Sequence, residues 1–205
     1  MVNDVKLIGL CGFKGSGKST AAEYLEQRDY RTIALASPLK KACQIIFHLS
    51  DSQVYDSEGK KKVDPRWGMT PREILQLFGT EVGRTFSSDV WIKSLTEYID
   101  KKDHDKWVID DVRFPNEADF IRDVGGRVIG INRKEVVPST TWKDYIPSSV
   151  ASILDIDQIH DSERKMLDNW EEMIDVEIRN DTSLSYLKNE ILQLSDEYEG
   201  AKRVT

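Results

Sequence analysis

Short apolar runs alternate with amphipathic segments along the chain, and this order predicts an α/β fold. In the clearest run, Val5–Leu10, apolar residues follow one another almost without interruption. Such runs are typical of strands that are buried on both faces of a parallel sheet. The predicted strands are Val5–Leu10, Tyr30–Ala36, Trp107–Ile109, Arg127–Arg133 and Val176–Asn180.

Segments with apolar residues at spacings of three and four lie between these runs and predict helices. The first, Ser19–Gln27, would place Ala21, Ala22 and Leu25 on one face. Further helices are predicted after Pro38, after Thr70, and over residues 89–99, 117–124, 161–173 and 183–199. Alternating strands and helices predict a three-layer α/β fold, in which a five-stranded, mostly parallel sheet is flanked by helices.

Local signals sharpen three parts of this pattern. Thr70-Pro71-Arg72-Glu73 has the spacing of a helix capping box, with proline at the first helical position. The polar segment 56–68, DSEGKKKVDPRWG, predicts a mobile loop because it contains glycine and proline. Residues 136–157 are the least regular part of the chain and are rich in Pro, Ser and Thr.

Length and composition indicate one medium-sized globular domain. The chain has 205 residues, of which 39% are hydrophobic and 32% charged, and no apolar run is long enough to span a bilayer. The N-terminal segment lacks the features of a secretion signal. Two isolated cysteines, Cys11 and Cys43, favour a reducing cytoplasmic setting with buried thiols. The net charge of -7 argues against a broad surface for nucleic acid.

The sequence GFKGSGKS, Gly12–Ser19, lies between the first predicted strand and the first predicted helix. It matches the pattern G-x-x-x-x-G-K-[ST] in full, which predicts a phosphate-binding loop. Glycines let main-chain N–H groups line an anion site, Lys18 would reach the β- and γ-phosphates, and Ser19 would bind Mg²⁺. A chance match is the alternative, but the flanking strand and helix argue against it. The predicted nucleotide-binding residues are Gly12, Lys14, Gly15, Ser16, Gly17, Lys18, Ser19 and Thr20.

A triphosphate site alone fits a motor, a switch or a kinase. A GTPase would need a guanine-reading N-K-x-D sequence after a later strand, and the nearest segments, INRKE and IRNDTS, do not match it. The chain is also short for a motor ATPase. These observations favour a kinase.

Carboxylates end the third predicted strand. Asp110 and Asp111 would lie at its mouth, where a carboxylate can hold Mg²⁺ opposite Ser19. Arg113 would share the side of Asp111 in extended geometry, and its planar guanidinium suits a phosphate. The alternative is a solvated surface ion pair between Asp and Arg.

Lysines, not carboxylates, follow the second predicted strand, in ASPLKKA. A kinase that phosphorylates a hydroxyl usually places a carboxylate at the acceptor, to take the hydroxyl proton. Lys40 and Lys41 instead suit an acceptor that is already an anion, such as a nucleoside monophosphate. Lysines on the outer face of a helix are the ordinary alternative.

Several motifs occur in an order similar to that in bacteriophage-type deoxynucleoside monophosphate kinases. They are the phosphate loop, ASPLKKA, REILQLFGTEVGR followed by Trp91, DVRFPNEAD, GGRVIGI and HDSE, over roughly Leu7–Leu187. The resemblance implies a single P-loop kinase domain over residues 1–205, with a helical acceptor-binding region at 37–100 and a lid at 133–164. It also implies ATP-dependent phosphorylation of a deoxynucleoside monophosphate for DNA precursor synthesis, with Mg²⁺, by a cytoplasmic homodimer (in the host cytoplasm for a viral protein).

Matching positions in this resemblance supply candidate acceptor-binding residues. They are Ser37, Lys40, Arg72, Gln76, Thr80, Arg84, Trp91, Asp111, Arg113, Glu117, His160 and Glu163. Arg72, Gln76 and Thr80 would share one helix face if the helix extends that far. Trp91 could stack on a base or fill the core, and Glu117 could serve only the helix dipole.

The same resemblance identifies the groups expected to act in transfer. Lys18 and Arg113 would act with the lid candidates Arg133 and Arg164, while Ser19 and Asp111 would hold Mg²⁺. Other functions stay open: a phosphomevalonate or dephospho-coenzyme A kinase, a non-catalytic nucleotide-binding protein, or a nucleic-acid 5′-end kinase. Neither stable nucleic-acid binding nor membrane association is expected.

Overall fold

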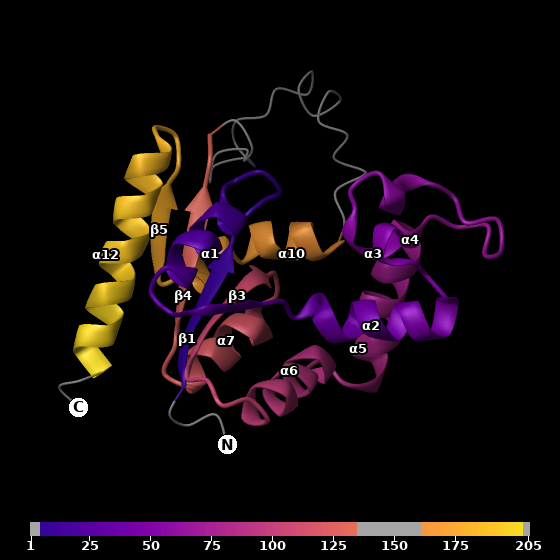
Figure 1. The fold of residues 1–205 in the computed structure, drawn as a ribbon, viewed down its shortest axis with the longest axis horizontal. Helices are drawn as coiled ribbons and strands as arrows, with labels where there is room; N and C mark the ends of the chain where they lie inside the picture. The colour runs from indigo at the N-terminus through magenta and orange to yellow at the C-terminus, as the bar shows by residue number, and fades with distance from the viewer. Residues whose placement is uncertain (1–4, 135–160, 203–205) are drawn as a thin grey trace. The chain divides into compact units, whose positions relative to one another are not determined.

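The computed structural model describes residues 5–134 and 161–202, with side chains for 5–134 and 165–201 (Figure 1). Contacts divide the chain into two compact units. The helical unit is Ala34–Asp103. The sheet unit comprises the described residues up to Ile33 and those from His104 onward.

Five parallel strands form the centre of the sheet unit. They are β1 (Lys6–Cys11), β2 (Arg31–Ile33), β3 (Lys106–Val112), β4 (Arg127–Asn132) and β5 (Val176–Arg179). Their order in the sheet is β2-β3-β1-β4-β5, and every neighbouring pair is parallel. The predicted sheet is therefore confirmed. Strand β2 is shorter than predicted, because the chain is already helical at Ala36.

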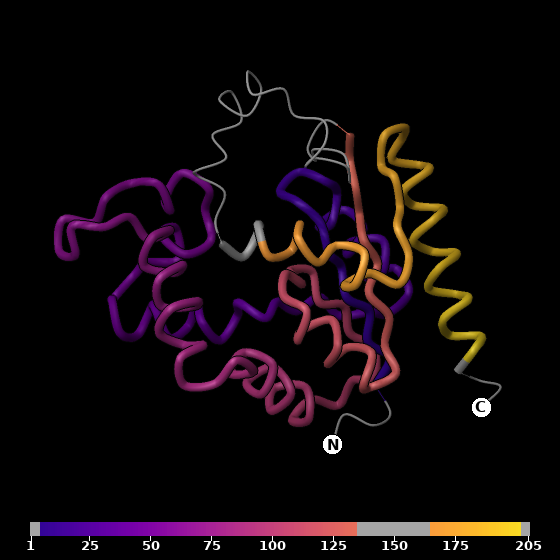
Figure 2. Tube along the Cα trace, turned by 180° about the vertical axis from the view of Figure 1, so that it is seen from behind, coloured from indigo at the N-terminus to yellow at the C-terminus, as the bar shows by residue number. Residues whose placement is uncertain are grey.

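Helices cover both faces of this sheet. The helices of the unit are α1 (Lys18–Glu26), α7 (Pro115–Asp123), α10 (Asp161–Asp168), α11 (Trp170–Met173) and α12 (Leu184–Lys202). On one face, Ile8 and Leu10 pack in a buried core with Leu25 of α1 and Leu187 of α12. Helix α12 runs beside β5 in both views (Figures 1 and 2).

The opposite face of the sheet packs against α7 and α11. A Cβ on Gly9 of β1 would lie 2.5 Å from Ile121 of α7, and one on Gly130 of β4 would lie 2.8 Å from Trp170 of α11. The side chains therefore alternate between the two faces, as the three-layer prediction requires. The single helix predicted over 161–173 is instead two helices, separated at Asn169.

The helical unit contains α2 (Ala36–Phe47), α3 (Asp51–Tyr55), a 3₁₀ turn η1 (Gly59–Lys61), α4 (Pro71–Gln76), a π-helix η2 (Leu77–Val82), α5 (Gly83–Phe86) and α6 (Val90–Asp100). The predicted capping box of Thr70 and Glu73 is present. Cys43, Val54 and Ile74 belong to the unit's core. None of the helices in the described ranges is long and apolar enough to cross a membrane.

The segment 56–68, predicted as a mobile loop, contains regular local structure. It contains η1 and a β-bridge between Asp64 and Met69. Asp64 is buried, and its carboxylate accepts hydrogen bonds from Arg66 Nε at 2.9 Å and Gln53 Nε2 at 2.9 Å. These bonds lower the pKa of Asp64, so a paired buried charge organises this turn.

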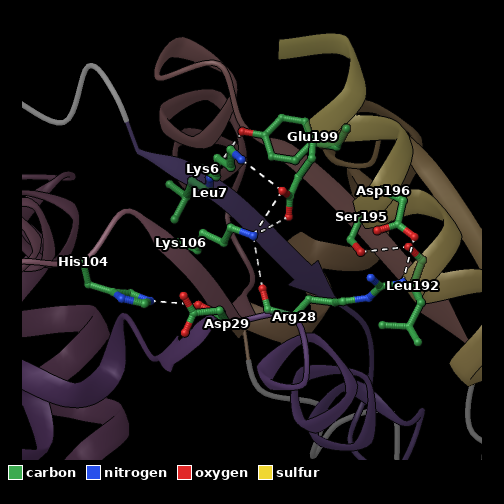
Figure 3. A network of polar contacts seen from close by, with 11 residues as sticks. Lys6, Leu7, Arg28, Asp29, His104, Lys106, Leu192, Ser195, Asp196 and Glu199 are labelled. Atoms are coloured by element: carbon green, nitrogen blue, oxygen red, sulfur yellow. Dashed lines mark hydrogen bonds and ion pairs between the residues drawn. The ribbon is translucent and has the colours of Figure 1, made fainter. Parts of the chain in front are cut away.

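A polar cluster fastens α12 to the amino ends of two strands (Figure 3). Glu199 is buried, and its carboxylate accepts from Lys6 Nζ at 3.0 Å and Lys106 Nζ at 2.9 Å. The neighbouring Tyr198 hydroxyl accepts from Leu7 N at 3.3 Å and donates to Gly125 O at 2.9 Å. Burial opposes ionisation of Glu199, but the bonds from Lys106 and Lys6 outweigh it, so its pKa is lowered.

Replacing Glu199 by alanine should lower the free energy of unfolding by about 2 kcal/mol, because it leaves two largely buried ammonium groups unpaired. Urea unfolding at pH 7 measures this loss. The pKa of Glu199 is lower in the folded protein than in the unfolded chain, where it is about 4.3. The stabilisation is therefore present above about pH 4.3 and is lost as the pH falls through the pKa of the folded protein. The difference between wild type and variant should therefore shrink below about pH 4.

Asp196→Ala is the matched control, because Asp196 is also on α12 and pairs with Arg28 at 2.9 Å. Both of these side chains are about half exposed, 45% for Arg28 and 56% for Asp196. The expected loss is therefore about 0.5 kcal/mol or less. Equal losses in the two variants would contradict the role given to Glu199.

Candidate active site

The glycine-rich loop between β1 and α1 packs tightly against the ends of two other strands. Gly12 and Gly17 have φ angles of 154° and 110°. A Cβ on Gly12 would lie 2.4 Å from Ile131 O, and one on Gly17 would lie 2.5 Å from Asn180 Nδ2. Both the backbone conformation and the available space therefore require glycine at these positions.

Polar groups of the loop are arranged as an anion cradle. Lys18 Nζ donates to Gly12 O at 2.7 Å and Phe13 O at 2.8 Å, so the lysine folds back over the loop. Ser16 Oγ is buried and has no hydrogen-bond partner among the described residues. Ser19 is exposed in the first turn of α1. A lysine, a buried hydroxyl and a helix N-terminus together suit phosphate oxygens.

Cys11 ends β1 directly before the loop. The thiol is fully buried, and burial raises its pKa to about 12, although the charge of Lys18 acts in the opposite direction. A protonated, buried thiol packs as a small apolar group and is not a nucleophile. The prediction of buried, unpaired thiols is confirmed for both Cys11 and Cys43.

Strand β3 bulges at the predicted carboxylates. Gly9 pairs with Ile109 and Cys11 with Val112, so Asp110 and Asp111 together face the single residue Leu10. An extra residue of this kind re-aims side chains and is common beside active sites. Asp111 and Arg113 are half-buried on either side of the buried Val112. The two acids thus lie inside the strand, and not after it as predicted.

Glu117 has a structural task at the start of α7. The side chain is only 3% exposed, and Oε2 accepts from Arg113 N at 2.8 Å and Phe114 N at 3.1 Å. These bonds fix the turn that carries Arg113. Its predicted part in substrate binding stays a prediction.

The candidate acceptor residues of the helical unit come from several elements. Ser37 and Lys40 are on α2, Arg72 and Gln76 on α4, Thr80 on η2, Arg84 on α5 and Trp91 on α6. Lys40 Nζ lies 5.2 Å from the centre of the Tyr55 ring. Arg84 Nη1 donates to Ser88 O at 2.8 Å, which ties it to the turn before α6.

The single helix face predicted for Arg72, Gln76 and Thr80 does not extend to Thr80. Helix α4 ends at Gln76, and the next turn is a π-helix with five-residue hydrogen bonds, such as Gly83 N to Phe78 O. The wider turn rotates Thr80 away from the four-residue spacing. Turns of this type often occur at functional sites.

Trp91 holds the π-helix. Its indole Nε1 donates to Gly79 O at 2.8 Å, and a Cβ on Gly83 would lie 2.5 Å from the indole ring. The glycines at positions 79 and 83 thus leave room for close packing on this turn. The indole edge is therefore used in packing, one of the two interpretations that the sequence leaves open.

The remaining candidates are described in part or not at all. Arg133 follows β4 and is exposed. Glu163 and Arg164 belong to α10, whose first side chains are not described, and His160 and residues 135–159 lie outside the described residues. The lid therefore stays a prediction.

Asn180 was missed by the sequence interpretation. It is the first residue after β5, and its side-chain Nδ2 donates to Ser16 O at 2.8 Å. Its position in the sequence could have revealed it, because Asn180 is the last residue of a predicted strand. Residues at and after the carboxyl ends of parallel strands lie at the same edge of the sheet as the phosphate loop.

Comparisons with known proteins agree on one family. The sequence model of the family described as deoxynucleotide monophosphate kinase matches residues 59–146. A relative from Acanthamoeba polyphaga mimivirus, named for that family, is 42% identical over 162 residues, and the match covers 70% of this chain and 80% of the relative. A deoxynucleoside-5'-monophosphate kinase of Escherichia phage T5 is 46% identical over 56 residues, 27% of this chain and 22% of that protein.

Solved structures agree on the fold. A dephospho-CoA kinase from Campylobacter jejuni has a TM-score of 0.53 at 15% identity, covering 94% of this chain and 97% of that chain. The protein TT1252 of Thermus thermophilus has a TM-score of 0.50, also at 15% identity, with the same coverage. The P-loop kinase fold predicted from the sequence is confirmed.

Trp91→Phe should lower the free energy of unfolding by about 1 kcal/mol or more, because a smaller aromatic ring replaces the indole and the bond to the carbonyl of the buried Gly79 is lost. Denaturant unfolding followed by circular dichroism measures the change. Trp67→Phe is the matched control: Trp67 Nε1 donates to Phe47 O at 3.0 Å, but the residue is 42% exposed. Water can replace that bond, so the loss should be smaller. A larger loss in Trp67→Phe than in Trp91→Phe would refute the role given to Trp91 in holding the π-helix.

Proposed function

The chain belongs to the deoxynucleotide monophosphate kinase family, and from that premise we propose that it transfers the γ-phosphoryl group of ATP to a deoxynucleoside 5′-monophosphate. The products are the deoxynucleoside diphosphate and ADP. The observation that carries the proposal is the anion cradle of Gly12–Ser19, with Lys18 Nζ folded over the loop and the Ser16 hydroxyl buried inside it.

The donor side would be formed by residues of the sheet unit. The loop fits a triphosphate, because positive-φ glycines open its backbone and the buried Ser16 hydroxyl can donate to an anion. Lys18 would exchange its two carbonyl partners for phosphate oxygens. Ser19 and Asp111 would hold Mg²⁺, which when bound neutralises charge on the phosphates.

The acceptor needs no catalytic base, because a monophosphate oxygen is already ionised. That oxygen attacks the γ-phosphorus while the bond to the ADP oxygen breaks, and catalysis consists of positioning and charge stabilisation. We assign the acceptor phosphate to Arg113 with Arg72 or Arg84. Lys40 adds a further positive charge on the acceptor side, and a lid arginine, Arg133 or Arg164, would stabilise the transferring group.

Two further properties belong to this proposal. A homodimer is expected from the resemblance, and the helical unit exposes large apolar side chains, among them Ile45 at 74% and Phe86 at 84%. The net charge of -7 supports a protein that acts on nucleotides without binding nucleic acid stably. An intracellular, cytoplasmic place of action would supply both ATP and the deoxynucleotide.

A coupled assay of ADP release should show transfer to at least one of dTMP, dGMP, dCMP and dAMP. The same screen should show none to phosphomevalonate or dephospho-coenzyme A, the acceptors of the rival P-loop kinases. No transfer to any deoxynucleotide would refute the proposal. ATP binding without any transfer would instead support a nucleotide-sensing protein.

Lys18→Ala should reduce turnover by about a thousandfold or more, because it removes the charge that faces the transferring group. Thermal unfolding should show that the variant remains folded. Lys101→Ala is the control, since Lys101 is exposed after α6 and pairs only loosely with Glu97 at 3.5 Å. Retained activity in Lys18→Ala would remove Lys18 from the mechanism.

A further inference from the structure

Carbonyl groups of the phosphate loop need partners on its outer side. When main-chain N–H groups face an anion, the carbonyl groups of the same peptides point away from it. Gly12 O and Phe13 O accept from Lys18 Nζ, whereas Ser16 O accepts from Asn180 Nδ2 at 2.8 Å. Ser16 O is therefore held from the outer side by an amide that follows β5, whereas Gly12 O and Phe13 O bond to the lysine that folds over the loop.

These two supports respond differently to nucleotide. Lys18 is the group proposed to bind the phosphates, so its bonds to Gly12 and Phe13 are given up when it does so. Asn180 is not among the residues proposed to bind the phosphates. Its bond to Ser16 O can persist with and without nucleotide, and so it can hold the loop in both states.

Asn180 is itself held on a rigid element. Its main-chain N–H donates to Asn132 O at 2.7 Å, which continues the pairing of β4 and β5 beyond Arg179. The next residue, Asp181, accepts from Lys134 N at 2.6 Å. The amide also fills the space beside Gly17, where a Cβ would lie 2.5 Å from Nδ2.

We infer that Asn180 is a positioning residue for the nucleotide donor, an inference that rests on the proposed function. Ser16 O and Gly17 N belong to one planar trans peptide, so their bonds point in opposite directions. Because Asn180 Nδ2 donates to Ser16 O from the outer side, the Gly17 N–H is directed toward the inner side of the loop. Asn180 acts on the phosphates through this peptide and not by contact.

Asn180→Ala should weaken ATP binding about tenfold, equal to about 1.4 kcal/mol, measured by titration without acceptor. The KM for ATP should rise with it, while the KM for the deoxynucleotide stays unchanged. Asn180→Asp should weaken ATP binding more, by about a hundredfold relative to wild type. A carboxylate can only accept hydrogen bonds, so it would repel Ser16 O. ATP-induced shifts in melting temperature give a second measure for any variant of lowered stability.

Asn132→Ala is the matched control. It removes another amide bond at the same sheet edge, from Asn132 Nδ2 to Glu177 Oε1 at 3.0 Å, without touching the loop through its side chain. Its affinity for ATP should equal that of the wild type. Three results would overturn the inference. They are unchanged ATP affinity in both Asn180 variants, a loss of ATP affinity in Asn132→Ala equal to that in Asn180→Ala, and a parallel rise of the KM values for ATP and the deoxynucleotide. A wild type that binds ATP without transferring phosphate would refute the proposed function, while the titrations would still decide the role of Asn180.

Discussion

Close backbone packing at the carboxyl edge of the parallel sheet is the constraint on which the donor site depends. The loop after β1 lies against Ile131 O at the end of β4 and against Asn180 after β5. Neither approach leaves room for a Cβ at Gly12 or Gly17. The loop geometry is therefore set by the registers of β1 with β4 and of β4 with β5, as much as by its own sequence.

The two edges of the sheet have different tasks. At the amino edge, Glu199 is buried between Lys6 and Lys106, which are the first residues of β1 and β3. At the carboxyl edge, the buried Ser16 hydroxyl lacks a hydrogen-bond partner within the described residues. Satisfied charges stabilise the fold at one edge, whereas an unsatisfied hydroxyl at the other remains available to a ligand.

Elements with local signals were the ones predictable from sequence. The strand before the loop, the glycine pattern and the Thr70 capping box depend on residues within a few positions of one another. The features left open or missed depend on distant contacts: Trp91, whose role the sequence leaves open, bonds to Gly79 twelve residues away, and Asn180, which was missed, bonds to Ser16 across 164 residues. The local structure of the segment 56–68 was also missed, because composition alone does not reveal that Asp64 bonds to Gln53 and Arg66.

If the proposed acceptor residues bind the deoxynucleotide, base selectivity belongs to the helical unit. The reacting phosphate is the same in every deoxynucleoside monophosphate, so discrimination among bases has to come from groups away from the reacting atoms. The π-helix Leu77–Val82 is a local departure from ideal helical geometry, and Trp91 maintains it through Gly79 O. This turn sets the directions of Thr80 and Arg84, which are proposed to bind the acceptor. On that proposal, changes around Trp91 would alter acceptor binding while the phosphate loop and its supports in the sheet unit stay unchanged.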